Sequence, residues 1–509
     1  MEENEETERH NFEAKEKFFW ADEVADEIIK KKGKKKEYVC ASGITPSGTV
    51  HMGNFREVIT TDLVARALKD KGKKVRFIYS WDDYDRLRKI PPNIPKSYEK
   101  HLGTPISEIP SPFGKKESYA GHFEKEFEKS LEKVDIKPEF IRQNSMYKKS
   151  KYAALIKTAL DKNNEIKKIL NKYRKEPLEK DWVPLEVYSK KTGKDDTEII
   201  DIKGYKITYR DSTGFQETID YRKVGNIKLK WRVDWPARWK YEKVDFEPGG
   251  IDHSVEGGSY TTAKEIAKKV FGIEPPVYQF YEFVRMKNGS EFSSSEGNAL
   301  TLDETESVYE PEIIRYIFVK TRPNKAFPIS FDNDIIKIYD EYDELENKYY
   351  NKELDERDTR IYEMSQVAKI TKKKPEKVGF RHLITLIQSG DTKNLNEESK
   401  RRAEKVKNWL AKYAGDDMKF SIREKVEIKI DKKQREALVS LREFLGKKNF
   451  SEDELNTEIF NICKAVGIEP KEFFEGAYGI IIGRSRGPRL ASLILSTGKD
   501  KIIKLLEQI

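Results

Sequence analysis

Apolar residues in the first part of the chain follow two spacings that predict alternating strands and helices. Residues 37–40 and 75–80 are short runs rich in β-branched and aromatic residues, typical of buried strands. Over 59–69 the apolar residues recur every three or four positions, the spacing of an amphipathic helix. A second helix is expected over 119–134. This alternation predicts a parallel sheet covered by helices.

The pattern changes after residue 160. Residues 161–234 combine a helical segment with a β-rich stretch whose turns carry glycine, and we interpret them as an insertion. A strand over 277–284 and a helix beginning at Pro311 continue the α/β pattern, and charged amphipathic helices are expected from residue 341 to the end. The expected segments are the first α/β half with an N-terminal helix (1–160), the insertion (161–234), the second α/β half (235–299), linking helices (300–345) and an all-α domain (346–509).

Composition narrows the class of protein. The chain has 509 residues, enough for about three domains. Its 98 Lys and Arg residues exceed its 89 Asp and Glu residues, for a net charge of +9, which permits a polyanionic partner without requiring one. Cys40 and Cys463 are far apart, which argues against disulfides and favours the cytoplasm. No apolar run approaches the roughly 20 residues of a membrane span, so no membrane association is expected.

Residues 41–54 form a glycine- and proline-rich turn between the first strand and the following helix. Glycines let a ligand approach the backbone, and the helix N-terminus offers N–H groups and partial positive charge that suit a phosphate. The turn lacks the patterns of dinucleotide-binding and P-loop proteins. It contains His51, whose imidazole can donate a hydrogen bond to a phosphate that gains charge. We interpret the turn as a nucleotide site; a surface turn with an incidental histidine is the alternative.

The order Pro46-Ser47-Gly48-x-x-His51-x-Gly53-Asn54 resembles the HIGH signature of class I aminoacyl-tRNA synthetases, and segments 81–85, 231–236 and 246–253 resemble the class I lysyl-tRNA synthetase family. The resemblance covers residues 18–509. It implies a Rossmann-type catalytic domain, an all-helical anticodon-binding domain and lysine–tRNA ligase activity. ATP, with Mg²⁺, and L-lysine would form lysyl-adenylate, and the lysyl group would pass to the 3′ ribose of lysine tRNA.

The resemblance also implies roles for individual residues. His51 and Asn54 would act on the triphosphate during adenylation. The residues expected to bind ATP are Ser47, His51, Gly53, Asn54, Gly250 and Asp252. Those expected to bind lysine are Gly43, Thr45, Asp82, Trp231, Asp234, His253 and Tyr281. Asp234 is the first choice for the side-chain ammonium and Asp82 the second.

The residues themselves leave alternatives open in three of these segments. The aspartates of 82–85 follow the second strand, where a parallel sheet binds ligands, but a solvated acidic turn would have the same pattern. Residues 231–239 hold three tryptophans, two arginines and Asp234, which suit either an apolar core or an aromatic wall for a cationic side chain. Residues 246–253 are expected to form a glycine turn and a helix start, whose Asp-His pair could contact substrate, cap the helix or bind a metal.

Zinc is expected to be missing from the insertion. Many members of the lysyl family carry Cys-x-x-Cys-Gly zinc knuckles there. This chain has Ser-Lys-Lys-Thr-Gly at 189–193 and a looser echo, Arg-Asp-Ser-Thr-Gly, at 210–214. Hydroxyl groups are poor zinc ligands beside thiolates, so we expect hairpin turns and no structural zinc.

The segment after residue 287 occupies the position of the mobile KMSKS loop of class I synthetases. In the lysyl family it usually reads Lys-Met-Ser-Ser-Ser-Lys-Gly-Asn, but here both lysines are glutamates, Glu291 and Glu296. The missing lysines would have neutralised charge on the departing pyrophosphate. The expected catalytic serines remain, at Ser293, Ser294 and Ser295.

Several consequences of the two glutamates stay open. Magnesium could bridge a glutamate to the triphosphate, Arg285 and Lys287 could supply the charge, or activation could be slow or lost. The last case describes a tRNA-binding relative with weak or no catalysis. A class I synthetase for another amino acid, such as glutamate, is a further alternative. A glutamate pocket should present an arginine, and the aspartates and aromatic residues argue against it.

Three arginines, Arg484, Arg486 and Arg489, lie on one glycine- and proline-containing turn near the C-terminus. Arginines on such a turn can hold phosphate or RNA, and a solvated turn is the alternative. The segment resembles the terminal motif of the lysyl family, which implies contact with the lysine tRNA.

Overall fold

The computed structural model describes residues 18–114, 117–287, 300–447 and 450–509, and the chain divides into two compact units. The first contains the described residues up to Glu306 together with Pro311–Ile329 and Glu353–Ile370. The second contains Ser307–Glu310, Ser330–Lys352 and the described part of Thr371–Ile509. The chain therefore passes between the units more than once between residues 306 and 371.

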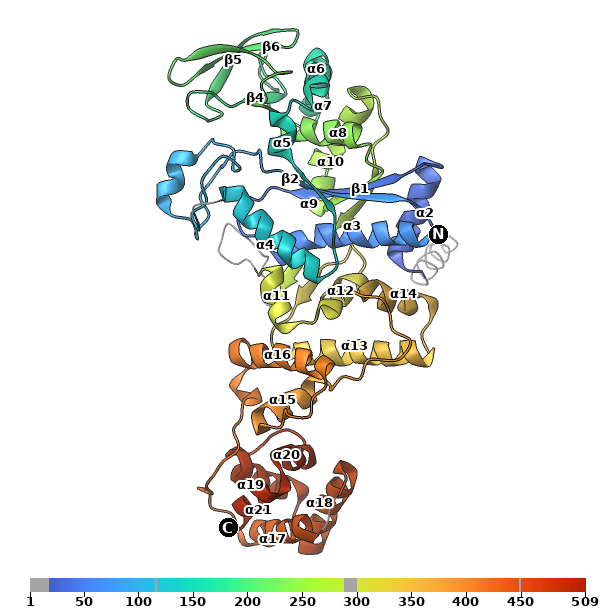
Figure 1. Cartoon of the computed structure of the whole chain (residues 1–509), viewed down its shortest axis with the longest axis vertical. Helices are drawn as coiled ribbons and strands as arrows, with labels where there is room; N and C mark the ends of the chain where they lie inside the picture. The colour runs from blue at the N-terminus through green and yellow to red at the C-terminus, as the bar shows by residue number, and fades with distance from the viewer. Residues whose placement is uncertain (1–17, 115–116, 288–299, 448–449) are drawn as a thin grey trace. The chain divides into compact units, whose positions relative to one another are not determined.

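A sheet of five parallel strands forms the centre of the first unit (Figure 1). Its order is β10-β9-β1-β2-β3, and the strands are β1 (Tyr38–Ile44), β2 (Val75–Trp81), β3 (Glu139–Arg142), β9 (Phe246–Gly250) and β10 (Val277–Tyr281). The strand order reverses at β1, and open parallel sheets bind ligands at the carboxyl ends of the strands beside such a reversal. The predicted Rossmann-type α/β fold is confirmed.

Helices cover both faces of this sheet (Figure 1). One face packs on α8 (Trp231–Glu242) and α10 (Ser259–Lys269) through a buried apolar cluster that includes Val39, Ile78 and Trp239. The other face is covered by α3 (Met52–Asp70) and α4 (Tyr119–Lys133). The remaining helices of this unit are α2 (Trp20–Lys32), η1 (Lys96–His101), α5 (Gln143–Lys148), α9 (Ile251–Ser254), α12 (Pro311–Lys320) and α14 (Glu356–Ser365).

Two segments differ from the expected local structure. Residues 246–250 were expected to form a turn, but they form strand β9, which pairs with β10 over five residues despite Pro248 and two glycines. Cross-strand pairing overrides the low strand propensity of these residues. The expected strand over 277–284 ends at Tyr281, because Glu282 N–H donates to Pro323 O at 2.8 Å. A separate strand, β11 (Val284–Met286), then pairs with β12 (Phe327–Ile329).

The β-rich insertion is present. Helix α6 (Ala153–Asp161) leads into it, and it begins with α7 (Asn163–Asn171). Its strands form a pair, β4 (Leu185–Val187) with β8 (Ile227–Leu229), and an antiparallel sheet of β5 (Thr197–Lys203), β6 (Lys206–Asp211) and β7 (Gln216–Asp220). These elements share one apolar core that includes Ile207, Tyr209 and Ile219.

Hydrogen bonds to two aspartates join the two turns where zinc knuckles were considered. Asp211 accepts from Ser189 Oγ at 2.7 Å and from Thr213 Oγ1 at 2.7 Å, and Asp196 accepts from Thr192 Oγ1 at 2.6 Å. Neither turn offers a thiolate or an imidazole, and the described residues contain no cluster of three potential metal ligands. The donor set therefore does not fit zinc.

Every described element of the second unit is helical: α13 (Asp334–Asn351), α15 (Phe380–Ser389), α16 (Glu397–Lys412), η2 (Asp416–Met418), α17 (Lys432–Lys447), α18 (Glu452–Val466), α19 (Pro470–Ile482), α20 (Leu490–Thr497) and α21 (Lys499–Leu506), with α11 (Leu302–Val308) ending at its start. Helices α17 to α21 share one apolar core. Arg402, which is fully buried, holds Glu310 at 2.8 Å and Asp343 at 2.6 Å. The expected helical character of the C-terminal region is confirmed, although Glu353–Ile370, with α14, belongs to the first unit.

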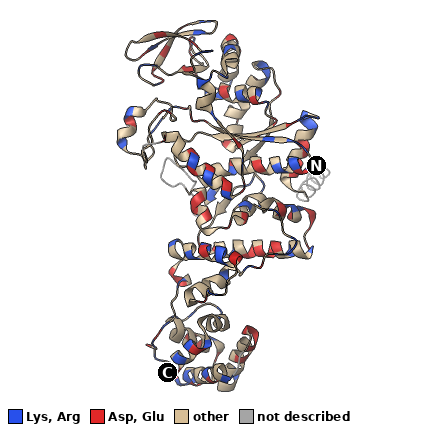
Figure 2. Ribbon diagram, viewed as in Figure 1, with Lys and Arg blue, Asp and Glu red and all other residues tan. Residues whose placement is uncertain are grey.

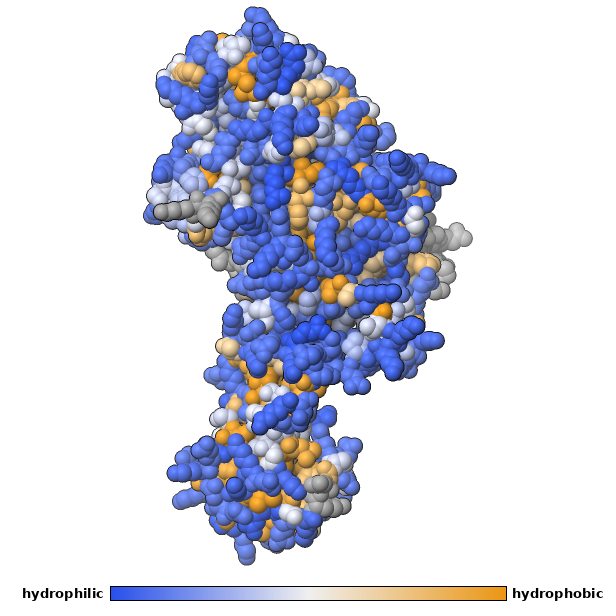
Figure 3. All heavy atoms as spheres, in the orientation of Figure 1, coloured by the Kyte–Doolittle hydropathy of each residue, from blue (hydrophilic) through white to orange (hydrophobic). Residues whose placement is uncertain are grey.

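Charged residues of both signs are interspersed along the helices of both units (Figure 2), and hydrophilic residues dominate the face shown in Figure 3. This distribution matches the high charge content of the sequence. No helix among the described residues is long and apolar enough to span a membrane.

Candidate active site

The signature turn forms the start of α3, and His51 is the residue that caps it. His51 Nδ1 accepts a hydrogen bond from Gly53 N–H at 3.1 Å, and Asn54 Oδ1 accepts one from His51 N–H at 3.2 Å. The second contact leaves the Nδ2 group of Asn54 as a donor. The two side chains therefore organise the first helical turn around the end of the helix that carries partial positive charge.

The protonation state of His51 follows from its burial. Desolvation lowers the pKa of His51 to about 4, so the ring is neutral at physiological pH. Because Nδ1 accepts a hydrogen bond, the neutral ring carries its proton on Nε2. The imidazole can thus donate a hydrogen bond without carrying a charge.

A cavity of about 430 Å³ lies beside this turn. Ser47, His51 and Asn54 line it from the signature, together with Ile44, Thr45, Gly48, Thr49 and Val50. The segment after β2 lines the other side, with Asp85, Arg86, Leu87, Arg88, Lys89 and Pro91. The structure thus brings three cationic side chains to the turn that was interpreted as a nucleotide site.

Glu57, on the second turn of α3, joins two of the residues predicted to bind lysine. Gly43 N–H donates to Glu57 Oε1 at 2.8 Å, and the Tyr281 hydroxyl donates to Glu57 Oε2 at 2.8 Å. Burial raises the pKa of Glu57 to about 8, although both hydrogen bonds oppose that shift. Gly43 has a steric role as well, because a Cβ atom there would lie 2.4 Å from Ser80 O.

Asp82 and Asp234, the two candidates for the lysine ammonium, lie together in a buried ion-pair cluster. Arg238 Nη1 is 2.6 Å from Asp82 Oδ1, and Arg238 Nε is 3.4 Å from Asp234 Oδ2. Asp234 is 1% exposed and accepts a short hydrogen bond from the Tyr147 hydroxyl. Burial opposes the charge of Arg238, but Asp82 and Asp234 outweigh it and raise its pKa. The two carboxylates thus share the single positive charge of Arg238; burial still raises the pKa of Asp82, and Asp234 Oδ2 accepts no hydrogen bond among the described residues.

Lys228 extends this cluster toward the nucleotide cavity. It pairs with Asp85 and lies 3.8 Å from Asp234 Oδ2. Burial alone would lower the pKa of Lys228, but the neighbouring aspartates raise it. Thr45 Oγ1 donates to the other oxygen of Asp85 at 3.2 Å, so Thr45 is held at the edge of the same cluster.

The tryptophans of α8 form a stacked row beside the sheet. The rings of Trp231 and Trp235 are 5.0 Å apart, and Trp235 lies edge-on to His253 at 5.7 Å. Trp239 Nε1 donates to Glu247 at 2.6 Å, and burial raises the pKa of Glu247 to about 7. Trp235 and Trp239 are core residues, whereas Trp231 is partly exposed.

Two of the residues predicted to bind ATP, Gly250 and Asp252, lie at the carboxyl end of β9. Gly250 ends the strand, and a Cβ atom there would lie 2.4 Å from Asp252 Oδ1. Asp252 is largely exposed, and its Oδ2 lies 3.9 Å from His253 Nδ1. Burial lowers the pKa of His253, so its ring is neutral like that of His51.

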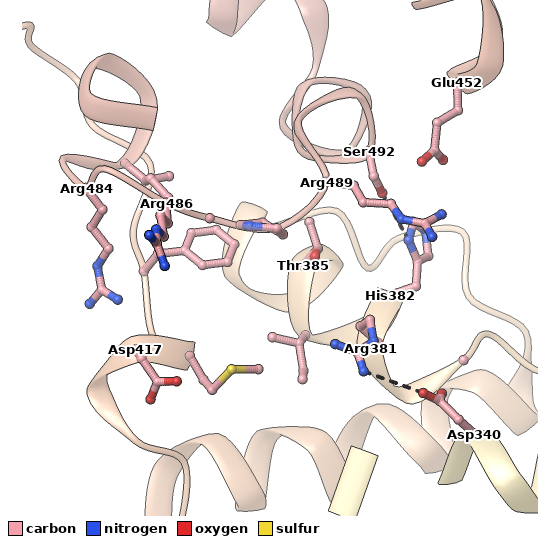
Figure 4. Close-up of a pocket in the computed structure, with 17 residues that line it drawn as sticks. Asp340, Arg381, His382, Thr385, Asp417, Glu452, Arg484, Arg486, Arg489 and Ser492 are labelled. Carbon is pink, nitrogen blue, oxygen red and sulfur yellow. Dashed lines mark hydrogen bonds and ion pairs between the residues drawn. The ribbon is translucent and has the colours of Figure 1, made fainter. Parts of the chain in front are cut away.

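The three C-terminal arginines line a pocket of about 920 Å³ in the second unit (Figure 4). Arg484 and Arg486 lie at one end of it, and Arg489 lies beside His382 at the other. His382 Nδ1 is 3.1 Å from Ser492 Oγ, and Arg381 pairs with Asp340 at 3.6 Å. The pocket is therefore rich in groups that can contact phosphate.

The serine loop, with Ser293, Ser294, Ser295, Glu291 and Glu296, lies outside the described residues.

Sequence reasoning missed several groups that the structure places in or beside the site. Glu57 had a local signal, because it is an acidic residue within the buried stretch of α3. Arg238 had one too, because it lies four residues after Asp234 on α8, whereas Lys228 had none, because its partner Asp85 lies more than a hundred residues away. Missed as well were Glu247, Arg86, Arg88 and Lys89.

The comparisons of sequence agree on one family. Residues 18–368 match the family described as tRNA synthetases class I (K). A lysine–tRNA ligase of Borreliella burgdorferi is 44% identical over 96% of this chain and 98% of its own length, and one of Thermococcus kodakarensis is 42% identical over 96% and 99%. A solved glutamate–tRNA ligase from Elizabethkingia meningosepticum aligns over 93% of this chain and 99% of its own, with 13% identity and a TM-score of 0.45.

Proposed function

Since the chain belongs to the class I lysine–tRNA ligase family, we propose that it joins L-lysine to its tRNA in two steps. In the first, the lysine carboxylate attacks the α-phosphate of ATP, forming lysyl-adenylate and releasing pyrophosphate. In the second, a hydroxyl of the 3′-terminal ribose of lysine tRNA attacks the adenylate carbonyl and releases AMP. Catalysis of the first step consists mainly of positioning and charge stabilisation.

The position of His51 gives the proposal its main support. Its neutral ring, protonated on Nε2, lies in the cavity at the start of α3. A hydrogen bond from Nε2 to the α-phosphate would strengthen as the phosphorus becomes pentavalent and its oxygens gain charge. The Nδ2 group of Asn54 would act on the same triphosphate, and Ser47 and Gly53 would contact it along the turn.

Adenosine would lie over the carboxyl end of β9. The close fit of Gly250 against Asp252 supports backbone contact with the nucleoside there. Asp252 is exposed and could accept a hydrogen bond from the ribose.

Two carboxylates, Glu57 and Glu247, would meet the ammonium groups of lysine. Both are buried with pKa values raised by burial, and no ion pair among the described residues includes either of them. Asp82 and Asp234 share the single cation Arg238, and we assign them to holding that cluster in place. A cationic substrate would supply the charge that Glu57 and Glu247 lack.

The other predicted lysine-binding residues would complete the site. Gly43 and Tyr281 hold Glu57 in place, and Thr45 lines the cavity beside the signature turn. Trp231 and His253 would border the apolar stem of the substrate. A glutamate substrate fits less well, because Arg238 is already paired with two aspartates.

ATP would enter as its Mg²⁺ complex. The described residues contain no group of three potential metal ligands, so phosphate oxygens and water would provide most of the coordination, as is usual for Mg²⁺. The tRNA would contact the second unit at Arg484, Arg486 and Arg489, whose guanidinium groups suit backbone phosphates.

Exchange of labelled pyrophosphate into ATP, measured with lysine and with glutamate, tests the proposal. The assay should be run with and without lysine tRNA. We expect lysine-dependent exchange and none with glutamate. A chain that binds lysine tRNA yet exchanges no pyrophosphate under any of these conditions would instead be a tRNA-binding relative without catalysis, the alternative suggested by Glu291 and Glu296.

A further inference from the structure

The two loop glutamates leave the departing pyrophosphate without its expected cations. Positions 291 and 296 carry acidic side chains where the lysyl family usually has lysines. Charge that develops on the β- and γ-phosphates during adenylation must still be stabilised. Other cations around the cavity lined by His51 would therefore have to stabilise this charge.

Arg88 and Lys89 line that cavity opposite the signature turn. Both side chains are exposed, and none of the ion pairs formed by the described residues includes either one. The third cation of the segment, Arg86, is paired with Asp195. Asp85, the acidic residue of the lining, forms an ion pair with the buried Lys228 and also attracts Arg88 electrostatically. The positive charge left for a ligand thus comes from Arg88 and Lys89.

The backbone that carries these two residues is anchored. Leu87 is 2% exposed, its N–H donates to Thr104 O at 2.9 Å, and its carbonyl accepts from Gly103 N–H at 3.0 Å. Ile106 N–H donates to Asp85 O at 2.8 Å. A fixed backbone means that phosphate binding costs side-chain entropy but little further backbone entropy.

We propose that Arg88 and Lys89 bind the β- and γ-phosphates of ATP and stabilise pyrophosphate as it leaves, in place of the two missing loop lysines. The inference rests on the proposed function, since it assigns these residues to the adenylation step. Arg285 and Lys287, the other cations considered, do not line this cavity. In the reaction the bond between the α-phosphorus and its bridging oxygen breaks, and both electrons leave with pyrophosphate.

The test compares Arg88→Ala, Lys89→Ala and the double variant with the wild-type chain in lysine-dependent pyrophosphate exchange. We expect the double variant to lose at least about 10-fold in rate and to show a higher KM for ATP and for pyrophosphate, with the KM for lysine unchanged. Lys96→Ala is the matched control, because Lys96 is an exposed lysine nearby in the sequence that does not line the cavity. A double variant that exchanges at the wild-type rate would overturn the inference.

Rescue separates direct phosphate contact from a structural role. Glu291→Lys/Glu296→Lys should restore most of the rate lost in the Arg88→Ala/Lys89→Ala chain and should raise the wild-type rate much less, a non-additive pattern. If the two lysines restored none of the lost exchange rate, Arg88 and Lys89 would not be acting in place of the loop lysines.

Binding of inorganic tripolyphosphate, measured by calorimetry, distinguishes failure of this inference from failure of the proposed function. Weaker binding by the double variant supports the assignment even if the wild-type chain activates no amino acid. Equal binding by the wild-type and double-variant chains would refute the assignment even if lysine activation is robust.

Discussion

The Tyr281 hydroxyl donates a hydrogen bond to Glu57 Oε2 at 2.8 Å and so joins the end of β10 to the second turn of α3. The other oxygen of Glu57 accepts from Gly43 at the end of β1. Two consecutive elements, β1 and α3, therefore meet β10, which is far away in the sequence, at one carboxyl group. Because this group is buried and lacks an internal cation, it is the place in the described fold best suited to a cationic substrate.

Replacing Glu57 by Gln should weaken lysine binding more than ATP binding. The pKa of about 8 means that Glu57 is protonated below that pH in the free protein and ionises as the pH rises. Lysine affinity should therefore increase about tenfold between pH 7 and pH 8.5, and Glu57→Gln should abolish the increase. Calorimetric titration of lysine at several pH values measures both effects. Tyr281→Phe, which keeps the carboxyl group of Glu57, should retain the rise of lysine affinity with pH. If the lysine affinity of the Glu57→Gln variant still rose with pH, Glu57 would not be the group that binds the lysine ammonium.

Replacing His51 by Ala should lower the adenylation rate by about 10²–10³, the usual loss for one donor that stabilises developing charge. With a pKa of about 4 the ring is neutral throughout pH 6–9, so the ratio of wild-type to variant rates should not change over that range. Single-turnover formation of lysyl-adenylate measures the adenylation rate of each chain. His101→Ala serves as the control, because His101 does not line the cavity, and an unchanged rate for His51→Ala would refute the assignment.

Asp234→Asn should destabilise the fold. The substitution removes the charge that faces Arg238 Nε and Lys228 and disturbs the hydrogen bond from Tyr147. Removing one partner of a buried ion pair typically costs about 3–5 kcal/mol. Denaturant unfolding of the variant beside Asp252→Asn, whose carboxylate is exposed, checks this expectation. A stable Asp234→Asn chain that selectively loses lysine affinity would return Asp234 to the role of substrate ligand.

The two turns of the insertion should not depend on metal. Asp211 accepts hydrogen bonds from the Ser189 and Thr213 hydroxyls and from the N–H groups of Thr213 and Phe215. Asp211→Ala would leave these donors without their acceptor, and we expect a loss of about 2 kcal/mol in unfolding free energy. Treatment of the wild-type chain with a strong zinc chelator should leave its Tm unchanged, and metal analysis should find no stoichiometric zinc.

Alanine at Arg484, Arg486 and Arg489 should weaken tRNA binding and reduce its dependence on salt. Removing one phosphate-binding side chain should make the slope of log K against log salt shallower by just under 1. Fluorescence anisotropy with lysine tRNA at several salt concentrations measures the slope, and ATP affinity should not change. Arg401→Ala, an exposed arginine outside the pocket, is the control. An unaltered slope for the triple variant would place the tRNA elsewhere.

The sequence by itself determined the local elements and the position of the nucleotide turn. The helical spacing over 59–69 predicted α3, and the signature placed His51 at its start, because capping and periodicity depend on residues within a few positions of one another. The absence of thiols from the insertion likewise led to the expectation of no structural zinc there.

Only the tertiary structure decided which charges face one another. Asp82 and Asp234 were predicted from the sequence to bind the lysine ammonium, and the fold brings Arg238 and Lys228 against them. The sequence analysis did not predict a role for Glu57, which the structure shows accepting hydrogen bonds from Gly43 and Tyr281. The carboxylates available to a cationic substrate are those that the folded protein does not already pair with its own cations. Residue spacing along the chain does not specify that pairing, because the partners come together only when the sheet and the insertion have formed.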